Sequence, residues 1–265
     1  MTWKEHTFVI CAYKTSPYLE ACIQSLLGQK VKSQVLMATS TPNDWILGLA
    51  KKYGLPLLAR EGKSSLAADW NFAYAQAQTP FVTLAHQDDV YGASYTWRIK
   101  NAAGKADRPL LLFTDYGELR SGKMESVNSF LRIKRLLLFP LRNQRIQKQI
   151  WVRRRILSLG NPICCPAVTY GKERLPGEPF REGFSSNTDW EAWERISRLQ
   201  GSFVYIPHVC MAHRIHGESA TTRIIEGEGR QGEDFAMFSR FWPGRVAAWL
   251  EGYYKKSEEW NHRGE

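Results

Sequence analysis

The feature that most constrains the fold is a short apolar segment that stops at two adjacent carboxylates. Four of the five residues from Phe81 to Ala85 are apolar and Thr79-Pro80 precede them, which predicts a buried strand. Asp88 and Asp89 therefore follow the carboxyl end of a strand. In open α/β sheets ligands bind outside such ends, and carboxylate oxygens there suit Mg²⁺ or Mn²⁺ carrying a diphosphate. A solvated turn is the alternative for an isolated acidic pair.

The chain before this segment alternates strands and helices with short connections. Ser16 with Pro17 is a typical helix start, Thr41 with Asp44 resembles a capping box, and Gly54 is a typical helix end. Strands are expected over 7–12, 35–39 and 56–59, and helices over 16–27, 41–53 and 66–78. This alternation predicts a parallel, three-layer α/β sheet in the first half. Neither a GxGxxG after the first strand nor a GxxxxGK[ST] occurs, so the usual dinucleotide fold and the P-loop are not supported.

The second half continues this pattern with a basic insertion. Further strands are expected at 110–114, 204–206 and 209–212, a return to the sheet at 161–168, and helices at 94–103, 144–159 and from 189 onward. Thr188 with Glu191 reads as a capping box, and Glu191 with Arg195 as a favourable i, i+4 pair. From about 226 the aromatic-rich end predicts one or two helices.

The net charge of +10 is concentrated in one segment. No acid occurs between Glu125 and Glu173, and this gap holds Arg132, Lys134, Arg135, Arg142, Arg145, Lys148, Arg153, Arg154, Arg155 and Lys172. Such a stripe predicts an anionic partner, either a membrane surface, a lipid diphosphate or nucleic acid. A helix with a core-facing apolar side and solvated charges is the alternative. Nucleic acid is disfavoured because the stripe has few interleaved aromatic residues.

Composition bounds the remaining classes. The chain has 265 residues, of which 43% are hydrophobic, enough for one large domain or two small ones. Its five scattered cysteines form no CxxC pair, so we expect reduced core thiols. No apolar run approaches the roughly 20 residues of a membrane span, and no signal-peptide pattern opens the chain. The expected location is the cytoplasm, with peripheral attachment to the inner face of the plasma membrane as an extension.

Four separated motifs resemble the GT-A inverting glycosyltransferases of family 2. They are Val9-Ile10-Cys11-Ala12-Tyr13 with Tyr18-Leu19 and Ser25-Leu26-Leu27-Gly28-Gln29, then Asp69-Trp70-Asn71, then His86-Gln87-Asp88-Asp89, and last Asp189-Trp190-Glu191 with His213-Arg214-Ile215-His216. Together they cover about residues 7–220. The resemblance implies a mixed, mainly parallel α/β sheet flanked by helices. It also implies a GT-A domain over 1–222, with a nucleotide-binding half (1–116), an acceptor half (117–222) that holds the basic segment 130–159, and a C-terminal helical extension (223–265).

The resemblance also implies a donor site. Its members would be Ala12, Tyr13, Ser40, Asp69, Asn71, His86, Gln87 and Asp88, with Asp88 bound to Mn²⁺ or Mg²⁺ on the donor diphosphate. Three positions depart from the family pattern. His86 replaces the first acid of the DxD motif, Trp70 replaces an arginine often found before the asparagine, and no acid that would read a uracil stands near Thr39 and Ser40.

On the acceptor side, Asp189 matches the family's general base, which takes the proton of the attacking hydroxyl. A favourable position in a helix's first turn is the alternative role for this acid. Trp190 is expected to stack on an acceptor sugar. His216 matches a histidine that in some relatives completes the metal site, with His213 as the alternative.

The resemblance implies a metal-dependent hexosyltransferase that inverts the anomeric configuration. The donor would be a UDP- or dTDP-sugar, and the acceptor a saccharide or lipid-linked saccharide of a bacterial surface polysaccharide, with residues 132–155 contacting an anionic membrane and no nucleic acid bound. A nucleotidyltransferase would need a glycine-rich, basic loop after the first strand, which residues 13–17 do not form. The alternative from another class is a non-catalytic module of the same fold that binds an anionic membrane or polymer.

Overall fold

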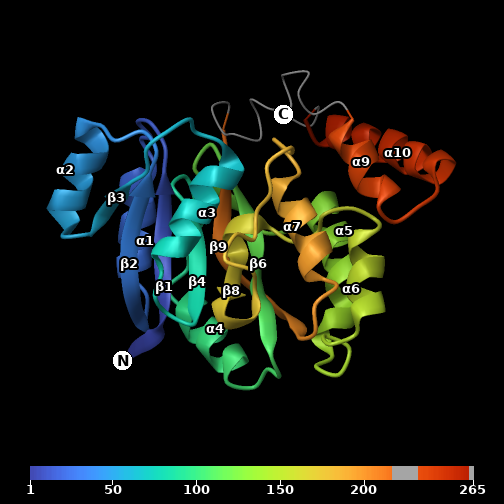
Figure 1. Ribbon diagram of the computed structural model, residues 1–265, viewed down its shortest axis with the longest axis horizontal. Helices are drawn as coiled ribbons and strands as arrows, with labels where there is room; N and C mark the ends of the chain where they lie inside the picture. Colours follow the sequence, from blue (N-terminus) through green and yellow to red (C-terminus); the bar gives the residue numbers. More distant parts are fainter. Residues whose placement is uncertain (217–231, 263–265) are drawn as a thin grey trace.

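The computed structural model describes residues 1–216 and 232–262, and these contain one large twisted sheet (Figure 1). Its described strands are β1 (Thr2–Ala12), β2 (Lys32–Thr39), β3 (Leu57–Ala59), β4 (Phe81–His86), β5 (Val90–Tyr91), β6 (Pro109–Arg120), β7 (Lys123–Glu125), β8 (Val168–Gly171) and β9 (Ser202–Ile215). They lie in the order β3-β2-β1-β4-β8-β6-β9-β5, and β7 pairs with β6.

Strand direction places several carboxyl ends at one edge of the sheet. Strands β3, β2, β1 and β4 pair in parallel, and β6 pairs in parallel with β9. Strand β8 is antiparallel to both β4 and β6, so it joins two parallel groups that run in the same direction. The predicted mixed, mainly parallel sheet is confirmed. The ends of β1, β2, β3 and β4 therefore meet at one edge, where the predicted donor residues lie.

Helices cover both faces of the sheet. The described α-helices are α1 (Leu19–Leu27), α2 (Asp44–Tyr53), α3 (Leu66–Gln76), α4 (Tyr95–Ala103), α5 (Ser129–Leu138), α6 (Ile150–Leu157), α7 (Thr188–Ile196), α9 (Glu233–Ser239) and α10 (Gly244–His262). Three short 3₁₀ helices are η1 (Phe139–Arg142), η2 (Cys165–Ala167) and η3 (Lys172–Arg174). No helix in these described ranges is long and apolar enough to cross a bilayer.

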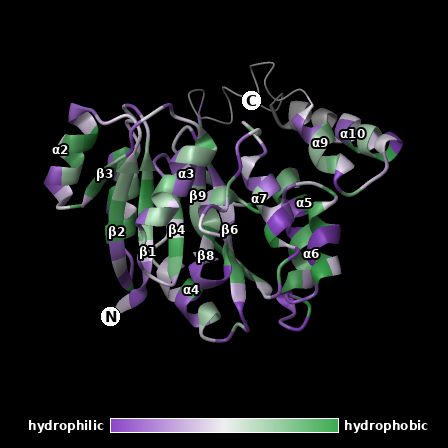
Figure 2. Cartoon of the chain, viewed as in Figure 1, coloured by the Kyte–Doolittle hydropathy of each residue, from purple (hydrophilic) through white to green (hydrophobic). Residues whose placement is uncertain are grey.

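Alternate residues of each strand enter different cores because successive side chains point to opposite faces. In β1, Val9 packs with α3 and α7 side chains on one face, whereas Phe8 and Ile10 pack with those of α1, α2 and α4 on the other. Figure 2 shows this arrangement as strongly hydrophobic central strands behind helices of mixed hydropathy. The sheet is thus held from both sides and supplies a rigid edge for a site.

At three predicted helix starts the side-chain caps differ from those expected. Helix α1 begins at Leu19, and the Ser16 oxygen accepts from the Tyr18 backbone nitrogen (3.2 Å) while its hydroxyl donates to Asp88 (2.7 Å). Helix α2 is capped by Asn43, whose side chain accepts from the backbone of Ile46, whereas Thr41 accepts from the backbone of Lys14.

Helix α7 also lacks its capping box, because the Thr188 hydroxyl donates to the backbone oxygen of Phe184 and Asn187 precedes the helix without a side-chain cap. The predicted Glu191–Arg195 pair is confirmed (2.9 Å). The predicted helix end at Gly54 is also confirmed, and its φ of 63° is one that glycine adopts readily.

Two predicted segments have different lengths. The helix expected over 144–159 is confined to α6, because η1 and the turns that follow it occupy the preceding residues. The strands expected at 204–206 and 209–212 form one strand, β9, in which the register shifts so that Ile206 and Val209 face consecutive residues of β6. Pro207 is tolerated there because a bulge needs no ladder hydrogen bond from it.

The two proposed domain boundaries, after residues 116 and 222, can be located in the fold. Residue 116 lies inside β6, so the two proposed halves share a strand. Residue 222 lies outside the described residues. Beyond it, α9 and α10 contribute Met237, Phe238 and Ala247 to the core that α7 also enters.

Candidate active site

Asp88 lies in the turn after β4, where it meets residues from two other segments. Its Oδ1 accepts the hydroxyl hydrogen of Ser16, at 2.7 Å. Its Oδ2 lies 3.3 Å from Nε2 of His216, the residue that follows β9. The Tyr18 ring lies against His216, with ring centroids 4.9 Å apart, and the Arg214 guanidinium lies 4.3 Å from the centroid of the same Tyr18 ring. The structure thus brings together the two residues predicted to hold a metal.

Asp89 is buried and, unlike Asp88, contacts the end of β9 through Arg214 and His213. Only 1% of its surface is exposed, and its Oδ1 accepts from the backbone nitrogen of Arg214 (2.8 Å) and contacts Nδ1 of His213 (3.0 Å). Burial lowers the pKa of His213, but the charge of Asp89 and its hydrogen bond outweigh burial, so this pKa is raised overall. The pair fastens the end of β9 to the turn. His213 is therefore occupied by Asp89, and His216 is the histidine on Asp88.

His86 ends β4 beneath the acidic turn. Burial lowers its pKa, and the positive charge of His213 adds to this, so a neutral imidazole is favoured although Asp88 and Asp89 oppose the shift. Its ring stacks on Trp70, with centroids 5.2 Å apart at 22°. Its Nε2 is buried and has no hydrogen-bond partner. This nitrogen is therefore a ready contact for a bound ligand.

The donor set at this turn fits a divalent cation that a diphosphate also ligates. Within the described residues no group of three or more His, Cys, Asp or Glu side chains can hold a metal without help. Mg²⁺ typically takes one or two carboxylates and completes its shell with substrate phosphates and water. The buried Oδ2 of Asp89 has no hydrogen-bond partner, so negative charge at this turn is not fully compensated. Asp88 with His216 thus meets the requirement for a substrate-dependent cation site.

Gln87 joins this turn to the end of β1. Its Oε1 accepts from the backbone nitrogen of Tyr13 and its Nε2 donates to the backbone oxygen of Tyr13, both at 2.9 Å. Ala12 is buried, whereas the Tyr13 ring is exposed and carries the Lys14 ammonium 5.1 Å from its centroid. Gln87 therefore positions the β1 loop through one donor and one acceptor of its amide.

Asp69 is the centre of a second polar cluster at the ends of β2 and β3. Its Oδ1 accepts from Nε (2.9 Å) and Nη2 (2.6 Å) of Arg60, and its Oδ2 accepts from the hydroxyls of Ser40 (2.8 Å) and Ser64 (2.5 Å). The predicted pair Ser40 and Asp69 is thus brought together. Because the carboxylate has four donors, it positions Arg60 and Ser40.

Asn71 does not face the same cluster. Its Nδ2 donates to the backbone oxygen of Phe180 (2.7 Å), and its Oδ1 accepts from the backbone nitrogen of Phe180 (3.0 Å). The side chain thus anchors the segment that precedes α7. One donor and one acceptor of its amide are used there, and the direct donor contact expected from the sequence stays a prediction.

Asp189 opens α7 and is held in place by two hydrogen bonds. Burial raises the pKa of its carboxyl, although hydrogen bonds from the Trp190 backbone (2.7 Å) and Asn161 Nδ2 (2.9 Å) and the charge of Lys134 work against that rise. A carboxylate with a raised pKa is a better proton acceptor than an ordinary aspartate. Lys134 comes from the basic segment and donates to the hydroxyl of Tyr116 (2.9 Å).

Cys164 connects the two acidic positions. Burial raises the pKa of its thiol, and the charges of Asp89 and Asp189 raise it further. The charges of both carboxylates therefore act on the same buried thiol. The five cysteines are all free thiols, as predicted.

Trp190 is a correction to the sequence prediction. Only 1% of its surface is exposed, its indole nitrogen donates to the backbone oxygen of Leu157 (3.1 Å), and its ring packs on Phe238 with centroids 5.1 Å apart. The side chain is part of the core between α6, α7 and α9, so it does not stack on an acceptor. It instead fixes the start of α7.

Sequence reasoning missed three residues of the site. Ser16 was taken as a helix cap, Asp89 had no role of its own, and Arg60 was not considered. Arg60 follows a predicted strand directly, and this position at the carboxyl edge of the sheet was a usable signal. Nothing local to Ser16 indicated a partner 72 residues away.

No protein-family model matches the sequence, and no curated protein matches it. The structure does match solved structures. The S. aureus TarS 1–349 structure in complex with UDP-GlcNAc gives a TM-score of 0.60 at 15% identity over 82% of this chain, and the chain spans 60% of the length of that structure.

Two further matches cover more of the chain. The mannosyltransferase PcManGT from Pyrobaculum calidifontis, in complex with GDP-Man and Mn²⁺, gives a TM-score of 0.57 at 14% identity over 94% of this chain and 69% of its own. Glucosyl-3-phosphoglycerate synthase from Mycobacterium tuberculosis gives 0.55 at 12% identity over 89% and 80%. These likenesses show that the chain has the GT-A glycosyltransferase fold expected from its motifs.

Proposed function

We propose that this protein is a metal-dependent inverting glycosyltransferase of the family 2 type, which moves a hexose from a nucleotide sugar to a hydroxyl acceptor. The observation that carries the proposal is the pairing of Asp88 with His216 after the ends of β4 and β9, and the raised pKa of Asp189 supports it. Asp88 and His216 are suited to binding a cation that carries a diphosphate, and Asp189 is suited to accepting a proton.

Asp88 and His216 would hold Mn²⁺ or Mg²⁺, which neutralises charge on the departing nucleoside diphosphate. Ser16 keeps the Asp88 carboxylate in place from the opposite side. His86 presents its buried Nε2 to the donor in place of the acid expected at that position. Ala12 and Tyr13 at the end of β1, with Ser40 and Arg60 at the ends of β2 and β3, would surround the nucleoside.

Asp189 would accept the proton of the acceptor hydroxyl as that oxygen attacks the anomeric carbon from the face opposite the diphosphate. Asn161 and the Trp190 backbone hold the carboxylate in one orientation. Positioning of this kind contributes as much as basicity, since proton removal must coincide with attack. A single displacement of this type inverts the anomeric configuration.

The donor and acceptor are inferred by analogy with the matched structures and from the sequence motifs. The TarS structure is a complex with UDP-GlcNAc and the PcManGT structure a complex with GDP-Man, so both uridine and guanosine donors occur on this fold. We propose a UDP- or dTDP-sugar and a saccharide or lipid-linked saccharide acceptor, in synthesis of a bacterial surface polysaccharide in the cytoplasm.

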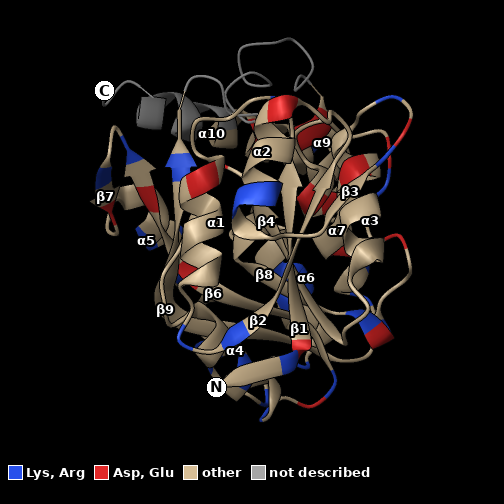
Figure 3. Cartoon of the chain, turned by 90° about the vertical axis from the view of Figure 1, so that its left-hand side faces the viewer, with Lys and Arg blue, Asp and Glu red and all other residues tan. Residues whose placement is uncertain are grey.

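Peripheral membrane attachment would use α5 and η1 and less of the basic stripe than the sequence indicated. Several of its cations have internal partners, as in Arg135 with Asp115 (2.5 Å) and Arg153 with three backbone oxygens between 197 and 201. By contrast Ile133, Leu136 and Phe139 recur every third residue and are exposed, with 72% of Leu136 accessible. An apolar face beside basic residues is suited to an anionic membrane surface. On the nucleotide side of the molecule acidic and basic segments are interspersed (Figure 3).

The test is calorimetric titration with UDP, GDP, dTDP and CDP, with and without Mn²⁺. We expect one nucleotide to bind in a metal-dependent way, and Asp88→Ala to abolish that dependence. Asp44→Ala, at an exposed helix start, is the matched control and should bind as the parent does. Transfer from the corresponding sugar nucleotide, with the anomeric configuration read by NMR, tests inversion. Nucleotide-independent binding of anionic vesicles without turnover would instead favour the non-catalytic module.

A further inference from the structure

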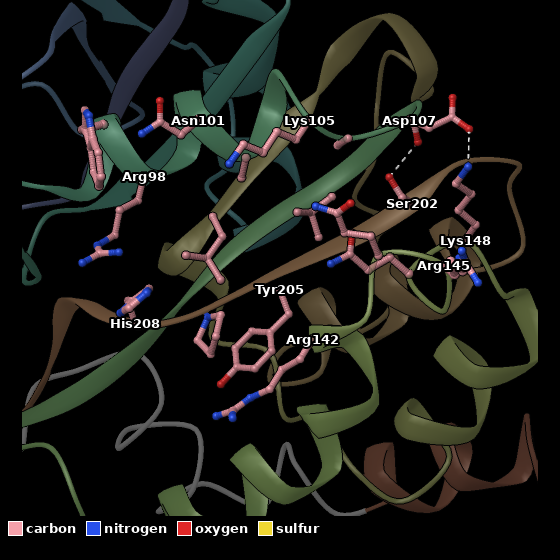
Figure 4. A pocket seen from close by; sticks show the side chains of 18 residues that line it. Arg98, Asn101, Lys105, Asp107, Arg142, Arg145, Lys148, Ser202, Tyr205 and His208 are labelled. Carbon is pink, nitrogen blue, oxygen red and sulfur yellow. Dashed lines mark hydrogen bonds and ion pairs between the residues drawn. The ribbon is translucent and has the colours of Figure 1, made fainter.

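A pocket lies away from the candidate active site, beside the first half of β9. It encloses about 490 Å³ between α4, the turn after it, the segment that begins at Arg142, and the first half of β9 (Figure 4). Its floor includes residues 202–208, whereas His216 follows the last residue of the same strand. The pocket therefore cannot be part of the proposed donor site.

The lining is strongly cationic. It contains Arg98, Lys105, Arg142, Arg145 and Lys148, against a single acid, Asp107. Lys148 neutralises Asp107 at 2.7 Å. Among the side chains that the structure describes, those of residues 1–216 and 232–254, no carboxylate forms an ion pair with the other four cations. Like charges gathered from two separate stretches of the chain repel one another unless an anion lies between them.

Two buried polar atoms of the pocket also have no partner. The Tyr205 hydroxyl belongs to a side chain that is 3% exposed, and it has no hydrogen bond. In Figure 4 this phenol points toward the side chain of Arg142. The Nε of Arg98 is likewise buried and unpartnered. A buried hydroxyl without a hydrogen-bond partner is unfavourable, so a ligand that accepts its hydrogen gains affinity from that contact.

We propose that this pocket binds a ligand carrying at least two phosphate groups. The cations are distributed around a volume larger than one phosphate fills, and arginine forks match phosphate oxygens in a bidentate way. In this proposal Arg98 and Arg142 contact the phosphate groups from two sides, and the Tyr205 hydroxyl donates a hydrogen bond to a phosphate oxygen. This site is independent of the proposed glycosyl transfer, since it shares no residue with it.

The test uses pyrophosphate as the probe, in low salt with EDTA so that no divalent metal assists binding at Asp88. The wild-type protein is expected to bind, and Arg98→Gln/Arg142→Gln to bind at least about tenfold more weakly. Lys4→Gln/Lys51→Gln removes the same charge from exposed positions elsewhere and should change affinity by less than about twofold. Equal losses in the two variants, or no binding by the wild type to any probe, would overturn the proposal.

Two further variants separate binding in this pocket from binding elsewhere on the protein. Tyr205→Phe removes only the unpartnered hydroxyl, so it should fold normally and weaken binding about threefold or more. Asp88→Asn should bind pyrophosphate as the wild type does, whereas loss of binding in this variant would assign the probe to the donor site and refute the pocket. Cardiolipin vesicles distinguish the source: binding of vesicles alone, lost in the arginine variant, supports the proposal with a lipid headgroup as ligand.

Discussion

Replacing Asp189 by asparagine tests the proposed chemistry most directly, because it removes the proton acceptor and almost nothing else. The carboxylate accepts two hydrogen bonds, from the Trp190 backbone and Asn161, and an amide oxygen can keep one of them. Loss of a positioned general base lowers kcat by about 10²–10⁴, equivalent to about 3–5 kcal/mol in the activation barrier. The donor contacts lie on other strands, so KM for the sugar nucleotide should change little.

The pH dependence gives an independent reading of the same residue. The reaction needs Asp189 as a carboxylate, so kcat/KM should fall as pH drops through its pKa. Burial raises that pKa, which places the acid limb above the ordinary value of about 3.9 for aspartate. Because the folded state holds this proton more tightly than the unfolded state, ionisation of Asp189 reduces stability as pH rises. Asp189→Asn should therefore be at least as stable as the wild type at neutral pH.

The assay is steady-state transfer over a pH series, with thermal unfolding of each variant. Asp44→Asn is the matched control, because Asp44 also stands in the first turn of a helix but is exposed at α2. We expect full activity from the control and a folded, inactive Asp189 variant without the acid limb. Retention of most of the activity by Asp189→Asn, with the acid limb in place, would refute the assignment of the base.

Three other outcomes follow from the same contacts. Asp88→Asn should lose metal-dependent nucleotide binding by calorimetry while keeping its unfolding midpoint, since its side chain is partly exposed; metal-dependent binding in this variant would remove Asp88 from the cation site. Asp89→Asn should lower the free energy of unfolding by about 2 kcal/mol in urea titration, because His213 loses a buried charged partner; unchanged stability would contradict that role. Ile133→Ser with Leu136→Ser should reduce sedimentation with anionic vesicles without changing turnover on a soluble acceptor, and unchanged sedimentation would place the membrane contact elsewhere.

Local pattern was sufficient for the strand framework. The apolar run that ends at His86 and the acids after it were placed correctly, because burial of a central strand leaves a signature within a few residues. Asp189 at the start of α7 and Gly54 at the end of α2 were placed for the same reason. The sheet edge that gathers these positions follows from alternation of strands and helices.

Contacts between distant segments were not readable. The long-range partners of Ser16 and Thr41, which are Asp88 and the Lys14 backbone, leave no signal in the residues around them. The sequence did not show which cations of the basic stripe have internal partners: Arg153 donates to three backbone oxygens beside α7, and burial lowers its pKa to about 10. A count of charged residues shows neither what each cation contacts nor how deeply it is buried. Trp190 likewise is an aromatic residue of the kind that stacks on sugars, but its side chain is buried in the core.

The two main departures from the family 2 pattern that the motifs resemble are Trp70 and His86, and they are connected because the two side chains contact each other. The position that often carries arginine holds Trp70, the position that carries the first acid holds His86, and the two rings stack at 5.2 Å. A cation at residue 70 would face a neutral imidazole, and an acid at residue 86 would face an indole, so either change alone would leave a half-buried charge without a partner. Together they replace two charged side chains by a neutral aromatic pair that packs on Phe180 as well. In the proposed cation site the negative charge would then rest on Asp88 and Asp89, so we expect Asp88→Asn to remove metal-dependent binding without a second acid at residue 86 to compensate.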